Sequence, residues 1–239
     1  MTKSRTFVYA LALAVIAAAI FISPSVHSQT AVLQLINGAT TVTVADQSGS
    51  DSNSTVGVVT YVGAVGDFET NVTTGSSKPI TGNATGPVLS LASLNITNTS
   101  NTAETITLLF SDNGFGPTTG FPQAALSVTQ LGQTPPSPPN GSVTYNNYWD
   151  ASNVTLAQTS LLTSIGPVTT GTESAIGALG SFAAPYALTQ VLTITLNAGG
   201  TFLGSADLVI VPEANGVLMS VLVALVLGIG FARRRLIKS

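Results

Sequence analysis

Short runs of aliphatic and β-branched residues, interrupted by turn residues about every 8–12 positions, constrain the fold of this chain more than any other feature. Apolar and polar side chains alternate within such runs, as in residues 192–197, which is typical of half-buried strands. No stretch of residues 29–210 shows an amphipathic helical repeat. The pattern predicts an all-β domain, an antiparallel β-sandwich of about ten strands. We expect the strands at residues 31–36, 40–45, 56–62, 65–73, 88–97, 105–110, 124–131, 142–149, 154–162, 187–196 and 202–211.

Turn residues predict how some of these strands are connected. Asn37-Gly38 is a strong hairpin signal, and Gly63 is expected to separate the next pair of strands. Residues 112–114 are expected to end the strand before them, and residues 197–200 to close a hairpin of the last two strands. Residues 175–184 are ambiguous between loop and helical turn. The proline-rich segment 134–141 is expected to be a stiff loop in one sandwich, with a boundary between two small domains as the alternative.

The N-terminal segment has the layout of a secretory signal peptide. Lys3 and Arg5 precede an apolar run over residues 7–22, and small residues offer a cleavage site between Ser28 and Gln29. We therefore expect residues 1–28 to form a signal helix that signal peptidase removes. Residues 29–210 are the expected exported domain.

The C-terminal segment combines an uncharged run with a basic cluster. Residues 216–231 carry no charge, and as a helix at about 1.5 Å per residue they reach about 24 Å, against roughly 30 Å of hydrocarbon. This is short for a permanent transmembrane helix, although flanking residues can extend it. The cluster that follows places the C-terminus in the cytoplasm by the positive-inside rule and consists of Arg233, Arg234, Arg235 and Lys238.

The order of polar motif, short apolar helix and terminal basic cluster over residues 211–239 resembles the PEP-CTERM sorting signal of exported bacterial proteins. The motif is Val211, Pro212 and Glu213, followed by Ala214 where that family usually has a second proline. The resemblance implies recognition and removal of the tail by an exosortase-type membrane enzyme. It also implies an association with exopolysaccharide and biofilm. The alternative is a plain tail anchor that is not processed.

The exported domain lacks most residue types that catalysis requires. Residues 29–212 hold no cysteine and no histidine, since His27 belongs to the signal segment, and Lys78 is their only basic residue against nine acidic ones. Neither a Ser-His-Asp or Cys-His apparatus nor a zinc or copper site can be built from this set. The negative charge also argues against a nucleic-acid partner. We therefore expect no enzyme, no cofactor and no metal centre.

Two arrangements of acidic residues stay open as weaker alternatives. Paired carboxylates could act as in glycosidases: Asp67 and Glu69 are expected on one strand face, and Glu104, Asp112 and Asp150 could approach one another in the fold. Solvated surface acids are the favoured interpretation. A calcium site is the second alternative, although a polar turn fits the sequence better; its oxygen donors would be Asp46, Ser48, Ser50, Asp51 and Asn53.

Aromatic and asparagine residues offer two further contact modes. Tyr145 and Trp149 are expected on one strand face with Tyr148 on the other, so a core position for Trp149 is favoured over a sugar-stacking platform. Acceptor-like Asn-x-Ser/Thr sites occur at Asn53, Asn71, Asn83, Asn95, Asn98, Asn140 and Asn153.

Taken together, the residues indicate a non-enzymatic exported protein of the cell surface or extracellular matrix. It is expected to be held transiently in the membrane by its tail and to contact polysaccharide weakly through hydroxyl and amide groups, or to self-associate. The alternative function is that of a carbohydrate-binding module of the cell surface.

Overall fold

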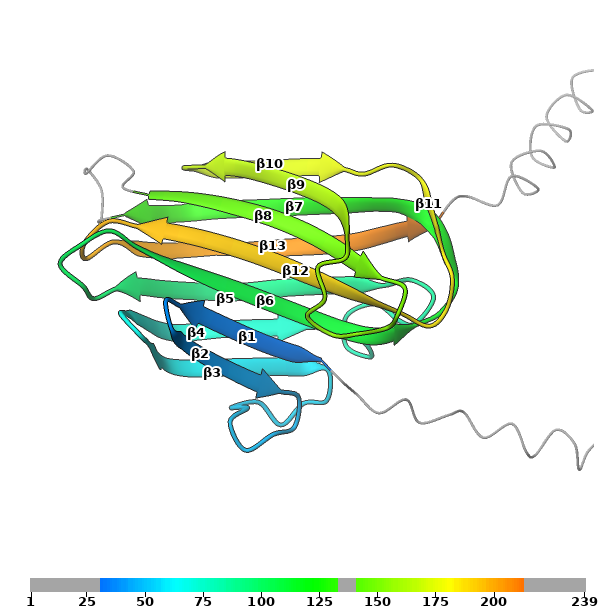
Figure 1. The fold of residues 1–239 in the computed structure, drawn as a ribbon, viewed down its shortest axis with the longest axis horizontal. Helices are drawn as coiled ribbons and strands as arrows, with labels where there is room; N and C mark the ends of the chain where they lie inside the picture. The colour runs from blue at the N-terminus through cyan, green and yellow to red at the C-terminus, as the bar shows by residue number, and fades with distance from the viewer. Residues whose placement is uncertain (1–30, 133–140, 213–239) are drawn as a thin grey trace, which may run out of the picture.

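The computed structural model describes residues 31–132 and 141–212, and the regular structure of this part is entirely β (Figure 1). Thirteen strands form two antiparallel sheets that pack face to face. The predicted all-β sandwich is thus confirmed, with more and longer strands than expected. Within residues 31–132 and 141–212 no helix is long and apolar enough to cross a bilayer. The expected signal helix and transmembrane helix lie outside the described residues.

Sheet A has six strands, and each pairs with its neighbours in antiparallel fashion. Their order across the sheet is β2 (Thr40–Ala45), β1 (Val32–Asn37), β6 (Glu104–Phe115), β12 (Tyr186–Leu196), β8 (Gly141–Asp150) and β9 (Ser160–Val168).

Sheet B has seven strands. Their order is β10 (Gly171–Ile176), β7 (Thr118–Gly132), β13 (Thr201–Pro212), β5 (Val88–Asn98), β4 (Phe68–Ser76) and β3 (Val58–Val65), and the short β11 (Gly180–Phe182) also pairs with β7. Both sheets contain strands from before and from after residues 133–140: β6 pairs with β12 in sheet A, and β13 lies between β7 and β5 in sheet B. The two sides of the proline-rich segment therefore share one sandwich.

The predicted hairpins differ in their outcome. The β1–β2 hairpin is confirmed, with Asn37 opposite Thr40 and Gly38 at φ +56° in the turn. β3 and β4 also pair as expected, but their turn lies at Gly66-Asp67 rather than Gly63. Gly63 sits within β3 at a shift in register, so the glycine marks an irregularity of the strand and not its end.

The expected hairpin between the last two strands is wrong, because residues 197–200 cross from one sheet to the other. β12 has β6 and β8 as neighbours in sheet A, and β13 has β7 and β5 in sheet B. Both edges of β12 are occupied, so β13 has no free edge to join. The crossing instead lets the apolar sides of the two strands face each other across the core.

Three strand limits also differ from the sequence prediction. β6 continues through residues 112–114 to Phe115, and β9 begins at Ser160, after a loop that starts at residue 151. Residues 175–184 contain no helical turn and instead complete β10 and form β11. Asn113 and Gly114 lie at a register shift between β6 and β12, with Gly114 at φ +69°, so these turn-forming residues mark an irregularity within the strand and not its end.

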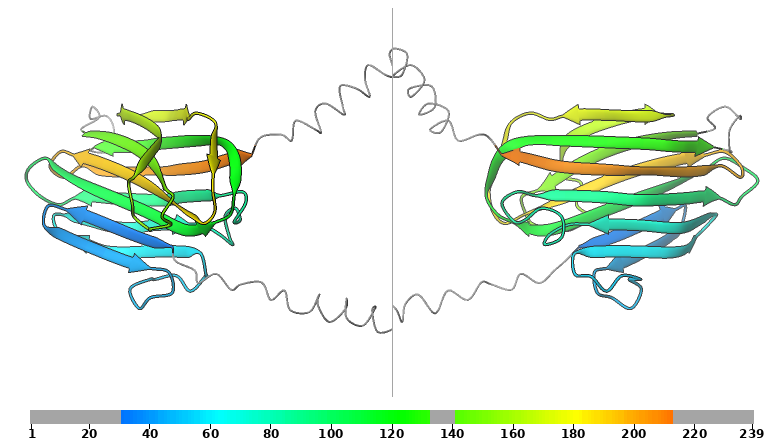
Figure 2. Two further views of the ribbon diagram at one scale, coloured as in Figure 1. Left: turned by 45° about the vertical axis from the view of Figure 1, so that its right-hand side comes forward. Right: turned by 180° about the vertical axis from the view of Figure 1, so that it is seen from behind.

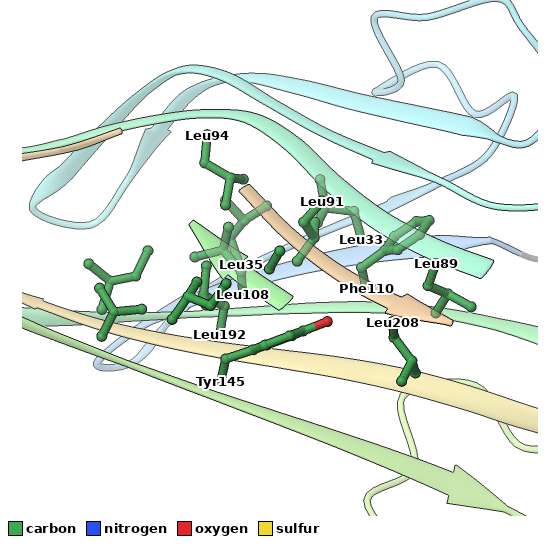
Figure 3. Packing of buried hydrophobic residues seen from close by; sticks show 14 of the residues in the cluster. Leu33, Leu35, Leu89, Leu91, Leu94, Leu108, Phe110, Tyr145, Leu192 and Leu208 are labelled. Atoms are coloured by element: carbon green, nitrogen blue, oxygen red, sulfur yellow. The ribbon is translucent and has the colours of Figure 1, made fainter. Parts of the chain in front are cut away.

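The core lies between the sheets and is continuous along their length. A fully buried Leu, Ile or Phe stabilises the fold by roughly 1.5–3 kcal/mol over its exposed state, so this cluster dominates stability. One polar group is built into it: Gln190 Nε2 of β12 donates to the Tyr145 hydroxyl and to the carbonyls of Leu89 (3.2 Å) and Ala206 (3.4 Å) in sheet B. Figure 3 shows the Tyr145 ring among Leu33, Leu35, Leu89, Leu91, Leu94, Leu108, Phe110, Leu192 and Leu208.

The two ends of the sandwich differ. The start of β1 and the end of β13 lie at one end, together with the longer connections (Figures 1 and 2). We call this the loop end; its loops are residues 46–57, 77–87, 151–159 and 177–185, the last of which includes the short β11. The opposite end, which we call the turn end, has the connections 38–39, 66–67, 99–103, 169–170 and 197–200. Both described chain ends therefore leave the domain from the loop end.

Candidate functional site

Irregularities in adjacent strands of sheet B line up and interrupt its outer face. The register shifts between β13 and β5 at Gly204–Ala206, and between β13 and β7 at Leu203–Gly204. On β5 the same line passes through Ser93, which adopts a positive φ of 54°. Gly204 is required at the crossing, because a Cβ there would lie 2.4 Å from the carbonyl oxygen of Ser127. Aligned bulges bend strands and redirect their side chains.

The aligned bulges form an open groove of about 430 Å³ on the outer face of sheet B. Leu203 and the buried Leu94 supply apolar surface, and hydroxyl and amide groups surround it. The polar lining comes from Ser93, Asn95, Thr129 and Ser205, without any charged residue. Neutral donors and acceptors around a small apolar floor suit a neutral, hydroxyl-rich ligand better than an ion.

Sequence reasoning did not find this groove. Ser, Thr and Asn are so common in the chain that its four polar residues carry no distinctive pattern. Gly204 within an otherwise strand-like run is the one available signal, because an isolated glycine in a strand often marks a bulge.

The acids proposed for calcium serve the loop backbone instead. Asp51 Oδ1 accepts hydrogen bonds from the backbone N–H groups of Asn53 and Thr60, both at 2.9 Å, and Asp46 Oδ2 accepts from Gly57 N–H at 2.8 Å. These bonds close the 46–57 loop on itself, which supports the polar-turn interpretation. Among the described residues, no three acidic or histidine side chains converge as metal ligands would.

The candidate catalytic carboxylates are dispersed. Asp67 lies in the β3–β4 turn, so it does not share a strand face with Glu69 as expected. Glu104 begins β6 at the turn end, whereas Asp112 and Asp150 lie near the loop end, with β12 between their strands. None of these five acids lines the groove over Ser93 and Gly204 or the hollow over residues 164–170 and 173–174.

Asp112 and Asp150 have structural partners. Asp112 Oδ2 accepts from Lys78 Nζ at 2.6 Å and from the Ser77 hydroxyl at 2.7 Å. Asp150 accepts from Val154 N–H at 2.9 Å and from the Thr159 hydroxyl at 2.7 Å. The backbone N–H of Val154, more than the hydroxyl, holds the pKa of Asp150 below its ordinary value. Both carboxylates thus fix loops of the loop end.

The aromatic cluster does not form a sugar-stacking platform. Tyr145 is fully buried, and that burial raises the pKa of its phenol far above the usual range. Trp149 packs against the core, edge-on to Phe182 with ring centroids 5.3 Å apart and edge-on to Tyr186 at 6.5 Å. The ring of Trp149 is partly buried and packed against the core, which supports the core or sandwich-end position favoured for it over a sugar-stacking platform.

The sorting motif begins inside the sheet. β13 runs through Val211 and Pro212, which pair with Phe121 and Gly120 of β7. The remaining predicted targeting residues lie outside the described residues and stay predictions; they are Ser28, Gln29, Glu213, Ala214, Arg233, Arg234, Arg235 and Lys238. Of the acceptor-like asparagines, Asn98 is fully buried and donates to three backbone carbonyls, so it is inaccessible in the folded domain.

Comparisons with known proteins give weak structural likenesses only. No protein-family model and no curated protein matches the chain. The carbohydrate-binding module TmCBM61, solved with β-1,4-galactotriose, has a TM-score of 0.28 and 7% identity over 57% of this chain and 82% of its own.

Two larger proteins also match in part. The enzymatically active domain of bacteriophage CBA120 tailspike protein 4 has a TM-score of 0.30 and 10% identity over 54% of this chain and 18% of its own. The isomalto-dextranase of Arthrobacter globiformis T6, solved with panose, has a TM-score of 0.24 and 14% identity over 64% of this chain and 23% of its own.

Proposed function

We propose that this chain is a non-enzymatic exported surface protein that contacts extracellular polysaccharide through the groove on the outer face of sheet B. In this proposal the N-terminal signal directs export, and the PEP-CTERM-like tail holds the domain at the membrane until an exosortase-type enzyme removes it.

The groove is the observation that carries the binding part of the proposal. Its hydroxyl and amide groups match the neutral hydrogen-bonding groups of sugars, and Leu203 can lie against the C–H face of a sugar ring. Because the groove is open and lacks an exposed aromatic ring, each contact is weak. Many copies along a polymer would then bind through multivalency rather than through one tight site.

Both described ends of the chain leave the sandwich at the loop end, and this supports the membrane-targeting part of the proposal. Both predicted hydrophobic segments have their basic residues on the cytoplasmic side, so both must reach the same membrane. The start of β1 and the end of β13 lie at the same end of the sandwich, which lets the two segments reach one membrane without strain on the domain (Figure 1).

Blocking the groove tests the binding function. Thr129→Trp places a large side chain at an exposed position of β7 that lines the groove. Gln123→Trp is the matched control, because Gln123 is exposed on the same side of the same strand but does not line the groove. Affinity electrophoresis through the producer's own polysaccharide should show retarded migration of the wild type and of Gln123→Trp, and loss of retardation for Thr129→Trp. Equal behaviour of all three proteins would refute the groove as the binding site.

A further inference from the structure

Large apolar side chains are exposed in the loops of the loop end. Val56, Ile80, Val154 and Leu179 are 40%, 57%, 54% and 47% exposed, and each comes from a different loop. Hydrogen bonds connect these loops: Ser77 N–H donates to Gly57 O at 2.8 Å. Lys78 Nζ donates to Asn113 O of β6, and the adjacent Gly114 N–H donates to Asn153 Oδ1 at 2.7 Å. β11, which follows Leu179, pairs with the start of β7, where the Thr118 hydroxyl donates to Thr85 O at 3.3 Å. The apolar side chains therefore share one end of the sandwich.

Strand residues add to this apolar end. Phe121, Leu161 and Ile176 are 38%, 58% and 69% exposed, and each lies where its strand meets the loop end. Of the large apolar side chains exposed in the described chain, Val62 in the interior of β3 is the exception. A concentration of this kind at one end is not expected of a domain that is surrounded by water on all sides.

Exposed carboxylates are found at the turn end, opposite to the exposed apolar side chains of the loop end. At the loop end the carboxylates of Asp46, Asp51 and Asp150 accept hydrogen bonds from their own loops, so their charge is directed inward. At the turn end, Asp67 and Glu69 are exposed. The long axis of the molecule therefore runs from an apolar end to an acidic end.

The length of the chain beyond β13 limits what can face the apolar end. Three residues, Glu213, Ala214 and Asn215, separate Pro212 from the uncharged run 216–231. Even fully extended at about 3.3–3.6 Å per residue, the link from Pro212 to Gly216 spans about 14 Å. If the run spans the bilayer, as the proposed function requires, the loop end lies close to the membrane surface.

We propose that the loop end is a membrane-contacting surface that rests on the outer face of a phospholipid bilayer, with the Ile80, Val154 and Leu179 side chains in the interface. This inference rests on the membrane tethering in the proposed function. Burial of these side chains removes apolar surface from water, and the inward-directed carboxylates limit repulsion by anionic lipids. The resting orientation directs the acidic turn end outward and holds residues 211–214 at the membrane surface, where an integral membrane enzyme can reach them.

Single-cysteine labelling of the full chain tests this orientation, since the natural sequence has no cysteine. The test positions are Ile80→Cys, Val154→Cys and Leu179→Cys. Val62→Cys controls for an exposed apolar site away from the loop end, and Asn101→Cys for an exposed site at the turn end. Each variant carries an environment-sensitive fluorophore and is reconstituted into phosphatidylcholine–phosphatidylglycerol vesicles that contain a headgroup nitroxide quencher. Unchanged Trp149 emission verifies that each variant is folded.

The expected result is quenching at residues 80, 154 and 179 that is about twofold or more stronger than at residues 62 and 101, because interfacial side chains enter the headgroup region. Equal quenching at all five positions, in protein that floats with the vesicles, would overturn the contact surface and leave the tether intact. Protein that fails to float with the vesicles would overturn the tether, and the contact surface with it.

Discussion

Several acidic side chains in this domain act as acceptors for backbone N–H groups. Asp46, Asp51 and Asp150 each bind loop backbone, although the sequence left them open as ligands or catalytic groups. With Lys78 as the only basic residue of 29–212, ion pairs cannot neutralise many of the acids, so the loops themselves provide the donors. The spacing of acids in the sequence does not reveal this role, because the donors belong to backbone that folds around them.

Asp150 gives a prediction for pH. Hydrogen bonds lower its folded pKa below the ordinary value, so the stabilisation is present at neutral pH and is lost as pH falls through the folded pKa, below about 4. Asp150→Asn should be destabilised by about 2 kcal/mol at pH 7, the magnitude of hydrogen bonds to a charged group. The difference from wild type should shrink toward pH 2.5. Urea denaturation followed by the emission of Trp149, the only tryptophan, measures both values.

Asp67→Asn is the matched control for Asp150→Asn, because Asp67 is exposed in the β3–β4 turn. It should stay within a few tenths of a kcal/mol of wild type at both pH values. A difference between Asp150→Asn and wild type that is the same at pH 7 and pH 2.5 would contradict the role of the carboxylate charge.

Strand existence could be predicted from the sequence, but strand partners could not. Alternation over residues 192–196 of β12 indicates that one side of this part of the strand is buried, and the pattern is the same whether the next strand pairs beside it or crosses to the opposite sheet. The Asn37-Gly38 signal is different, since the two-residue turn that it predicts, found at Gly38-Ala39, connects strands only as a hairpin. Local turn chemistry therefore fixed the β1–β2 pair, whereas the partners of β12 and β13 depend on strands distant in the sequence.

We predict that the domain self-associates through an unprotected edge strand. β2 is an edge of sheet A with the sequence TTVTVA, which has no charge, proline or bulge to block pairing with another chain. We expect concentration-dependent association of the full-length protein in detergent, measured by sedimentation velocity. Thr41→Lys, at an exposed position of β2, should reduce it strongly by placing like charges opposite each other.

Thr172→Lys is the control for the β2 edge. Thr172 is exposed on β10, an edge of sheet B that already carries the charged residue Glu173, and the variant should associate like wild type. A wild-type protein that remains monomeric at all concentrations would remove self-association from its functions.

At the scale of the whole molecule, the sequence predicted the architecture more directly than the contact sites. The predicted targeting segments are contiguous in the sequence, and they stay predictions because they lie mostly outside the described residues. The groove and the apolar surface of the loop end are each formed by residues from three or more elements that are far apart in the sequence. Thr129, Ser205 and Asn95 come together only because strands after and before residues 133–140 alternate in sheet B.

The position of Glu213 leads to a prediction for processing. Glu213 is the only charged residue between Asp207 and Arg233, and it follows directly after the strand that ends at the loop end. Its carboxylate is therefore the one charge that a membrane enzyme would meet at the outer interface. Acidic residues contribute little to membrane topology, so Glu213→Gln should insert normally yet fail in recognition. In a bacterium with an exosortase-type enzyme, intact-mass spectrometry should find surface protein without Arg233–Arg235 for wild type and for the control Glu104→Gln, and a retained tail for Glu213→Gln. A tail retained on wild-type surface protein would contradict processing and leave the plain anchor as the correct interpretation.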